Sequence, residues 1–174
     1  MSTVVGTLAS GETVVQKKGA HLHADGVADL LETALARISC DRRYFIKEVI
    51  DFGRVVGCTD CVLLDESDAS NVFYAQRPKR AGFTKFVRHR DPQPCSSIVI
   101  IMTLDRENSA QFNLVTAFIG ALPEPEPWDE RAFVREIDPD AARARAMEFW
   151  LHRALVAKGS EGFDPDTETG ICPW

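Results

Sequence analysis

Two stretches decide the predicted fold: Ser97–Met102, which reads SIVIIM, and Phe112–Ile119, which reads FNLVTAFI. The first is apolar throughout after its serine, which is typical of a central strand buried on both faces. The second is also rich in apolar residues, and the turn-forming residues Asp105–Asn108 lie between the two. We therefore predict that they form adjacent antiparallel strands, joined as a hairpin, in the middle of one sheet.

Several shorter segments upstream are rich in β-branched and aromatic residues, which favours further strands. They are Tyr44–Phe52, Cys61–Leu64, Val72–Gln76 and Phe83–Arg88. No helical segment separates these strands, so the sequence offers no crossover for parallel pairing. The pattern predicts an antiparallel meander of about five strands rather than a doubly wound sheet.

Helices are predicted on either side of the strands. From Asp25, as N-cap, to Ile38 the apolar residues recur at helical spacing. A C-terminal helix is predicted to start at Asp138 and Pro139 and to stop at Gly159. Its expected apolar stripe is Met147, Trp150, Leu151, Ala154 and Leu155. The fold class is therefore α+β, with an N-terminal helix, an antiparallel meander sheet and a C-terminal helix.

The length of 174 residues is suited to one domain with its own core. We expect a single α+β domain over residues 25–174. Residues 1–24 contain three glycines between Val-rich pieces. They are predicted to form an N-terminal arm, or a hairpin that turns at Ser10–Glu12.

Composition also bounds the cellular setting and the cofactors. No apolar window reaches about 18 residues, and the first residues lack the pattern of a secretory signal, so we expect a cytoplasmic protein without a membrane span. The five cysteines are expected to be reduced thiols. Cys58 and Cys61 have the spacing of half a zinc site, which His21 and His23 could complete, but the pair alone is a weak signal and we predict no metal. No phosphate-binding glycine loop occurs, so no cofactor is expected.

The charge distribution gives the main functional signal. Residues 69–90 contain no acid and carry a charge of +6, whereas the rest of the chain carries −12 to give the total of −6. The cations are Arg77, Lys79, Arg80, Lys85, Arg88 and Arg90. With Phe83 and Phe86 interleaved and Tyr74 beside them as stacking faces, this segment predicts binding of single-stranded RNA. An alternative is a solvated loop whose cations pair with the acidic segment Glu124–Asp140 of the same chain.

Four motifs carry a resemblance to known proteins. They are Phe52–Gly57 (FGRVVG), Tyr74–Arg80 (YAQRPKR), Phe86–Arg88 (FVR) and Leu114–Gly120 (LVTAFIG). Their arrangement resembles small bacterial proteins of unassigned function, and it is similar to the barnase, colicin-ribonuclease and RelE-like toxin superfamily. The similarity covers roughly residues 25–120. Two features depart from that pattern: no His–His–Lys set can be located, and an acidic extension follows Gly120.

This resemblance implies a metal-independent ribonuclease on a helix-plus-antiparallel-sheet fold. In that reaction the RNA 2′-hydroxyl attacks the adjacent phosphate, which requires a base, an acid and cations. The resemblance implies that His89 is the acid or base. Arg77, Arg80 and Thr116 complete the implied catalytic set. The implied RNA-binding residues are Lys79, Lys85, Arg88, Arg90, Phe83 and Tyr74.

The sequence leaves open whether the chain is an enzyme. The alternative is a non-enzymatic interaction module whose basic face docks an acidic protein partner. An enzyme requires His89, Thr116 and the arginines to converge in one concave site. Cations that point outward separately favour the interaction module.

Overall fold

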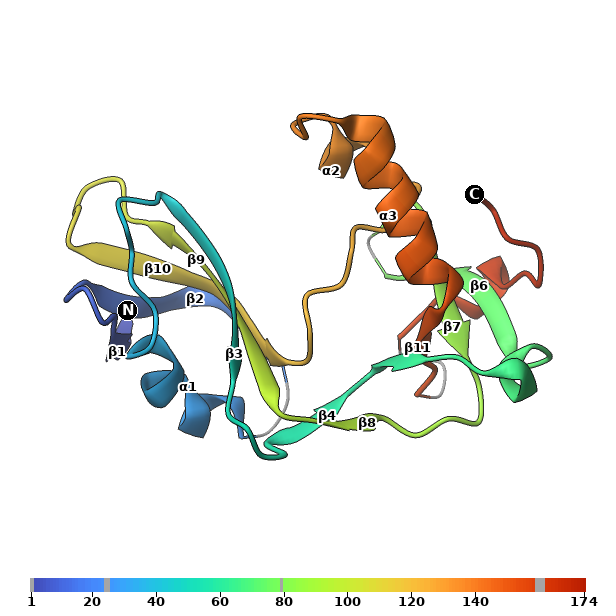
Figure 1. Ribbon diagram of the computed structural model, residues 1–174, viewed down its shortest axis with the longest axis horizontal. Helices are drawn as coiled ribbons and strands as arrows, with labels where there is room; N and C mark the ends of the chain where they lie inside the picture. Colours follow the sequence, from blue (N-terminus) through green and yellow to red (C-terminus); the bar gives the residue numbers. More distant parts are fainter. Residues whose placement is uncertain (1, 24–25, 79, 159–161) are drawn as a thin grey trace. The chain divides into compact units, whose positions relative to one another are not determined.

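The structure is a computed structural model that describes all residues except 1, 24–25, 79 and 159–161 (Figure 1). By its internal contacts the chain divides into two compact units. Unit 1 comprises residues 1–59 and 94–122, and unit 2 comprises residues 60–93 and 123–174. Both contain strands and helices, so the α+β class is confirmed. The sequence predicts one domain over residues 25–174 and gives no linker that marks this subdivision.

Unit 1 is built on a five-stranded sheet. Its strand order is β1 (Thr3–Thr7), β2 (Thr13–His23), β10 (Gln111–Ile119), β9 (Ser97–Leu104) and β3 (Phe45–Asp51). β9 and β10 pair antiparallel, from Leu104 opposite Phe112 to Ile98 opposite Ile119, and each has a further neighbour. The predicted central hairpin is therefore confirmed. Residues 3–23 form the predicted hairpin, with the Leu8 amide donating to the Glu12 carbonyl at 2.9 Å.

The helix α1 (Val27–Leu35) closes the core of unit 1. Its N-cap is Gly26, with φ of +85°, and the predicted cap Asp25 lies outside the described residues. Leu31 and Leu35 pack on the sheet, where Phe112 is fully buried. The 3.6-residue spacing of the apolar side chains explains this one-sided burial.

Unit 2 is built on a four-stranded sheet. Its strand order is β5 (Cys61–Leu63), β11 (Arg153–Val156), β7 (Phe83–Val87) and β6 (Val72–Gln76). Its helices are α2 (Glu130–Phe133) and α3 (Pro139–Leu151), with the 3-10 turns η1 (Glu66–Asp68) and η2 (Pro165–Thr167). A separate two-stranded sheet pairs β4 (Gly57–Thr59) with β8 (Gln93–Cys95), where the chain passes between the units.

The predicted antiparallel meander is wrong, because each large sheet contains one parallel pair. β10 runs parallel to β2, and β11 runs parallel to β7. A parallel pair requires a long connection, usually with a helix. α1 follows β2 in the first connection, and α3 precedes β11 in the second. Both sheets are therefore mixed, and residues 3–23 belong to one of them.

The C-terminal helix starts as predicted but ends earlier. The Asp138 side chain accepts from the Ala141 amide at 3.0 Å, and Pro139 is the first helical residue. α3 ends at Leu151, before the predicted stop at Gly159, which lies outside the described residues. Ala154 belongs to β11, where pairing with strands on both sides overrides the continued helical spacing of the sequence.

Candidate functional site

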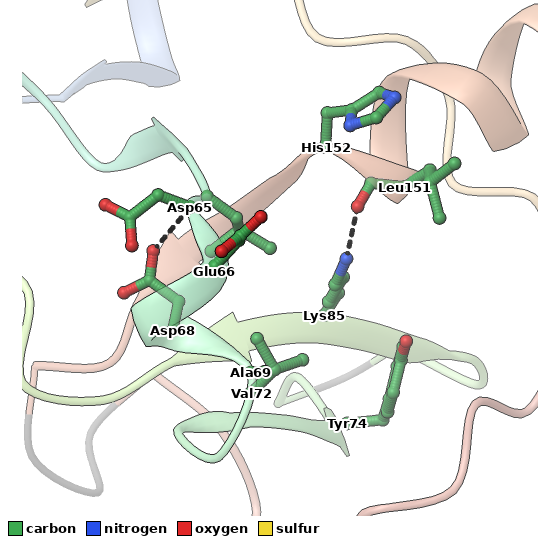
Figure 2. A pocket seen from close by; sticks show the side chains of 10 residues that line it. Asp65, Glu66, Asp68, Ala69, Val72, Tyr74, Lys85, Leu151 and His152 are labelled. Atoms are coloured by element: carbon green, nitrogen blue, oxygen red, sulfur yellow. Dashed lines mark hydrogen bonds between the residues drawn. The ribbon is translucent and has the colours of Figure 1, made fainter.

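Unit 2 contains a pocket of about 500 Å³ (Figure 2). Side chains from η1, β6, β7 and the end of α3 line it. Its ionisable and hydroxyl-bearing residues are Asp65, Glu66, Asp68, Tyr74, Lys85 and His152. Most of the lining residues are therefore polar, and a cavity of this size and lining is suited to a small polar ligand.

Lys85 forms one wall of the pocket and is almost fully buried. Its Nζ donates to the carbonyls of Trp150 and Leu151, at 2.8 and 2.9 Å. Both carbonyls belong to the last turn of α3. The carbonyls of a last helical turn have no partner within the helix, and they carry partial negative charge. An ammonium has three donors, so one N–H is not used by these two carbonyls. Burial lowers the pKa of Lys85.

Tyr74 lies directly opposite Lys85 in the antiparallel pair of β6 and β7. Opposite residues of such a pair point to the same face, so the phenol and the ammonium border the same space. The Trp174 ring packs edge-on against the Tyr74 ring, with centroids 5.1 Å apart. Burial raises the pKa of Tyr74 further above neutral pH, where a phenol is in any case protonated and can donate a hydrogen bond.

The acidic side of the pocket comes from η1. Asp65 accepts from the Ser67 amide at 2.9 Å, and Asp68 accepts from the Asp65 amide at 2.8 Å, which fixes the turn. Arg90 Nη1 lies 3.0 Å from Asp65 and 3.3 Å from the buried Asp68, so it offsets part of their charge. Hydrogen bonds from Ser67, together with Arg90, hold the pKa of Asp65 below its usual value. Glu66 lies between these aspartates in the sequence, and it also lines the pocket (Figure 2).

His152 follows the last residue of α3 and borders the pocket near Leu151 (Figure 2). Its Nε2 lies 3.3 Å from Oε1 of Glu148, one helical turn earlier. A carboxylate in this position can orient the imidazole. Sequence reasoning missed His152 and Glu66, since neither lies in the basic segment.

Arg77 and Arg80, predicted as catalytic, meet on one buried carboxylate. Arg77 Nη2 lies 3.0 Å from Oε2 of Glu126, and Arg80 Nη1 lies 3.7 Å from the same oxygen. The Thr84 hydroxyl donates to the other oxygen of Glu126, a residue that is only 6% exposed. The proline-rich acidic segment thus folds back on the basic loop within unit 2.

The other two predicted catalytic residues lie elsewhere. His89 is exposed, with φ of +58°, in the turn after β7, and it does not line the pocket. Thr116 lies on β10 in unit 1, where its hydroxyl donates to the His21 carbonyl at 2.9 Å. Among the predicted site residues, Arg77 thus lies close to Arg80, and Tyr74 lies close to Lys85. These two pairs form separate groups.

The predicted RNA-binding cations are held mainly by internal partners. Arg88 pairs with Glu168, and its guanidinium lies 4.0 Å from the centroid of the Phe73 ring. Phe83 is half-buried, and Lys79 lies outside the described residues. The cations of this segment that the structure describes with internal acceptors are Arg77, Arg80, Lys85, Arg88 and Arg90. This internal pairing leaves much less free positive charge than the sequence suggested.

The described parts of the chain contain no group of three or more His, Cys, Asp or Glu side chains placed to hold a metal ion. All five cysteines are thiols. Burial raises the pKa of the Cys61 thiol to about 11. Across the residues with described positions, no helix combines the length and apolar character needed to cross a membrane.

Comparison with known proteins gives information on the fold alone. No protein-family model matches the chain, and no curated protein matches it in sequence. The chain is similar in structure to a conserved hypothetical protein from Toxoplasma gondii ME49, with a TM-score of 0.51 and 9% identity. The similarity covers 70% of this chain and 76% of that chain. At this identity it supports a common fold and does not bear on the ribonuclease resemblance.

Proposed function

We propose that this chain is a metal-independent ribonuclease that acts on single-stranded RNA in the cytoplasm, with its chemistry in the pocket of unit 2. One observation carries the proposal: Glu66 in η1, Lys85 in β7 and His152 directly after α3 line one pocket of about 500 Å³. A carboxylate, an ammonium and an imidazole together supply what phosphodiester transesterification requires. The proposal moves the predicted site away from the basic loop.

Each group has one role in the proposed reaction. Glu66 takes the proton of the 2′-hydroxyl, whose oxygen attacks the adjacent phosphorus. The unused N–H of Lys85 stabilises the charge that develops on the phosphate oxygens. His152, held by Glu148, gives its proton to the leaving 5′-oxygen. The products are a 2′,3′-cyclic phosphate and a free 5′-hydroxyl, so DNA is not a substrate.

The internal ion pairs predict how RNA binding depends on salt. Each new phosphate contact on a single strand lowers the logarithm of affinity by about 0.7 per tenfold rise in salt. Arg80 and Arg88 are already paired with carboxylates, so fewer cations of this segment are free to neutralise phosphates and release the counterions condensed on the RNA. We therefore expect a shallow salt dependence for RNA binding.

Site-directed variants test the proposal on a fluorescent single-stranded RNA in the presence of a chelator. We expect His152→Ala to reduce cleavage about 10²–10⁴-fold, and Glu66→Gln to have a similar effect. His89→Ala is the matched control, because it removes an exposed histidine of the same unit outside the pocket. An RNA with 2′-deoxy sugars at the cleaved positions should resist cleavage. The proposal fails if purified protein does not cleave RNA, or if cleavage is the same in His152→Ala as in the wild type.

A second candidate is the non-enzymatic module that docks an acidic partner. It is favoured by Glu126, an acidic residue flanked by prolines that already occupies Arg77 and Arg80. An acidic, proline-containing segment of a partner can replace it in the same position. A synthetic peptide with the sequence of residues 123–128 should then bind Glu126→Ala more tightly than the wild type, as measured by fluorescence anisotropy. Equal binding, or none, would exclude this candidate.

A further inference from the structure

β3 is an end strand of the sheet in unit 1, and none of the described strands pairs with its second edge. The Leu104 amide donates to the Tyr44 carbonyl at 2.8 Å. At the other end of β3 the Phe52 amide donates to the Ser96 carbonyl at 2.9 Å. Even-numbered residues therefore bond to β9. In an antiparallel strand, successive residues direct their backbone N–H and C=O groups to opposite sides. The N–H and C=O groups of the odd-numbered residues therefore point toward the open edge. These residues are Phe45, Lys47, Val49 and Asp51.

The side chains of the same residues lie on the sheet face away from the core. Phe45 is 54% exposed and Val49 is 40% exposed, whereas the neighbouring Ile46 is fully buried. Lys47 and Asp51 are exposed on either side of Val49. The edge thus carries an apolar centre between a positive and a negative residue. An open edge presents unpaired backbone groups to another strand, and its charges restrict which strand can pair with it.

We infer that β3 pairs antiparallel with β3 of a second copy of this chain, with Val49 at the two-fold axis. In this register Val49 faces Val49 of the second copy, and Lys47 faces Asp51 of the second copy on both sides of the axis. A register centred on Lys47 instead places two lysines opposite each other, and one centred on Glu48 places two glutamates opposite each other. Opposite charges across a strand pair stabilise it and like charges destabilise it. Charge complementarity therefore favours a second copy as the occupant, in the register centred on Val49 rather than on Lys47 or Glu48.

The ends of the strand are compatible with this register. Gly53 follows β3 in a bend with φ of +65°, so the paired segment ends at the two contacts between Lys47 and Asp51. Arg37 donates to the Asp51 carbonyl at 3.0 Å, and a carbonyl oxygen accepts a second hydrogen bond. The amide of Lys47 in the second copy can use that second position.

A crosslinking experiment tests the position of the axis. Val49→Cys is made in full-length protein in which the exposed Cys58 and Cys172 are replaced by serine. Hydrogen-bonded residues of a strand pair have Cα atoms about 5.5 Å apart, within the range of a disulfide. Mild oxidation should give a covalent dimer. The control is Val4→Cys, a 63% exposed residue on the end strand β1 at the opposite edge of the same sheet, which should stay monomeric. Equal crosslinking of both variants would overturn the inference.

Charge exchange tests the register. Lys47→Glu and Asp51→Lys should each weaken self-association about tenfold or more, as measured by sedimentation velocity, because each places like charges together. An equimolar mixture of the two variants should associate again, since both contacts then join opposite charges. Circular dichroism checks that each variant is folded, and Lys47→Glu/Asp51→Lys in one chain should self-associate as a second route to rescue. A wild type that remains monomeric at millimolar concentration, or a mixture that gives no rescue, would overturn the inference.

Discussion

Units 1 and 2 bury different kinds of residue. Unit 1 has one large apolar cluster that joins α1 to its sheet. Unit 2 has three smaller apolar clusters, and it contains all the buried polar and charged residues found in the described chain. These are Asp68, Thr84, Lys85 and Glu126. Buried polar groups destabilise a fold unless they are partnered, so unit 2 depends on specific contacts where unit 1 depends on apolar packing. The candidate site lies in unit 2, where these buried polar and charged side chains have fixed partners.

The largest expected loss of stability comes from a substitution in the apolar core of unit 1. Phe112→Ala removes a fully buried ring and should lower the free energy of unfolding by about 3–5 kcal/mol. Val115→Ala, at a 43% exposed position of the same strand, should change it by about 0.5 kcal/mol or less. Urea denaturation followed by circular dichroism measures both. Similar losses for the two variants would contradict the role assigned to this core.

A smaller loss is expected when a polar contact of unit 2 is broken. Glu126→Gln keeps the shape of the side chain but leaves Arg77 and Arg80 without their shared carboxylate. The partly exposed arginines recover some solvation, so the free energy of unfolding should fall by about 1–3 kcal/mol. Glu136→Gln, at an exposed position of the same unit, is the control. A loss no larger than that of the control would show that unit 2 does not depend on this contact.

The stability of unit 1 should depend on pH through Asp105, a carboxylate in the turn between β9 and β10. Hydrogen bonds from Lys17 and Asn113, both 2.8 Å, hold the pKa of Asp105 well below its ordinary value of 3.8. The folded state therefore favours the charged carboxylate, and this stabilisation is complete above pH 3.8 and is lost as the pH falls toward the folded-state pKa. Asp105→Asn should be less stable than the wild type at pH 7, and the difference should shrink below about pH 4. Glu107→Gln, in the same turn, is measured alongside as the control, because the hydrogen bonds from Lys17 and Asn113 go to Asp105.

The smallest expected effect is a difference in reactivity between two thiols, one in each unit. Cys58 in unit 1 is exposed, whereas burial raises the pKa of Cys61 in unit 2 to about 11. The thiolate is the reactive form, so at pH 8 iodoacetamide should modify Cys61 more than about tenfold slower than Cys58. Mass spectrometry of peptides after timed labelling measures both rates. Equal rates in the folded protein would argue against the burial of Cys61.

Local sequence patterns predicted the elements whose burial is set by their own spacing. The apolar run of β9 and the helical spacing of α1 are examples. Other strands were left open or missed because long-range pairing decides their structure. The segment of β2 contains Gly19 and was predicted as part of a hairpin or as an arm, and its pairing with β10 makes it a sheet strand. The short strands β4 and β8 and the strand β11 were not predicted. β11 continues the helical spacing of α3, and its burial between β5 and β7 makes it a strand.

The candidate site was predicted only in part for the same reason. Tyr74 and Lys85 were selected as an aromatic residue and a cation of one segment, and they are neighbours across one strand pair. Glu126, 49 residues beyond Arg77, is brought there by tertiary structure that no local pattern encodes. His152 reaches the pocket because the chain turns from α3 into β11 at that residue. The acidic turn that contains Glu66 was visible in the sequence only as a turn.

The pairing of β4 with β8 shows where the chain can be shortened by protein engineering. Residues 60–93 leave unit 1 after β4 and return to it through β8, and these neighbouring strands lie about 4.8 Å apart. A designed turn of a few residues between them would therefore excise this insert and leave the two parts of unit 1 as one continuous chain. Unit 2, in contrast, is encoded in two separate stretches. It can be expressed alone only through a new linker that joins residue 93 to residue 123.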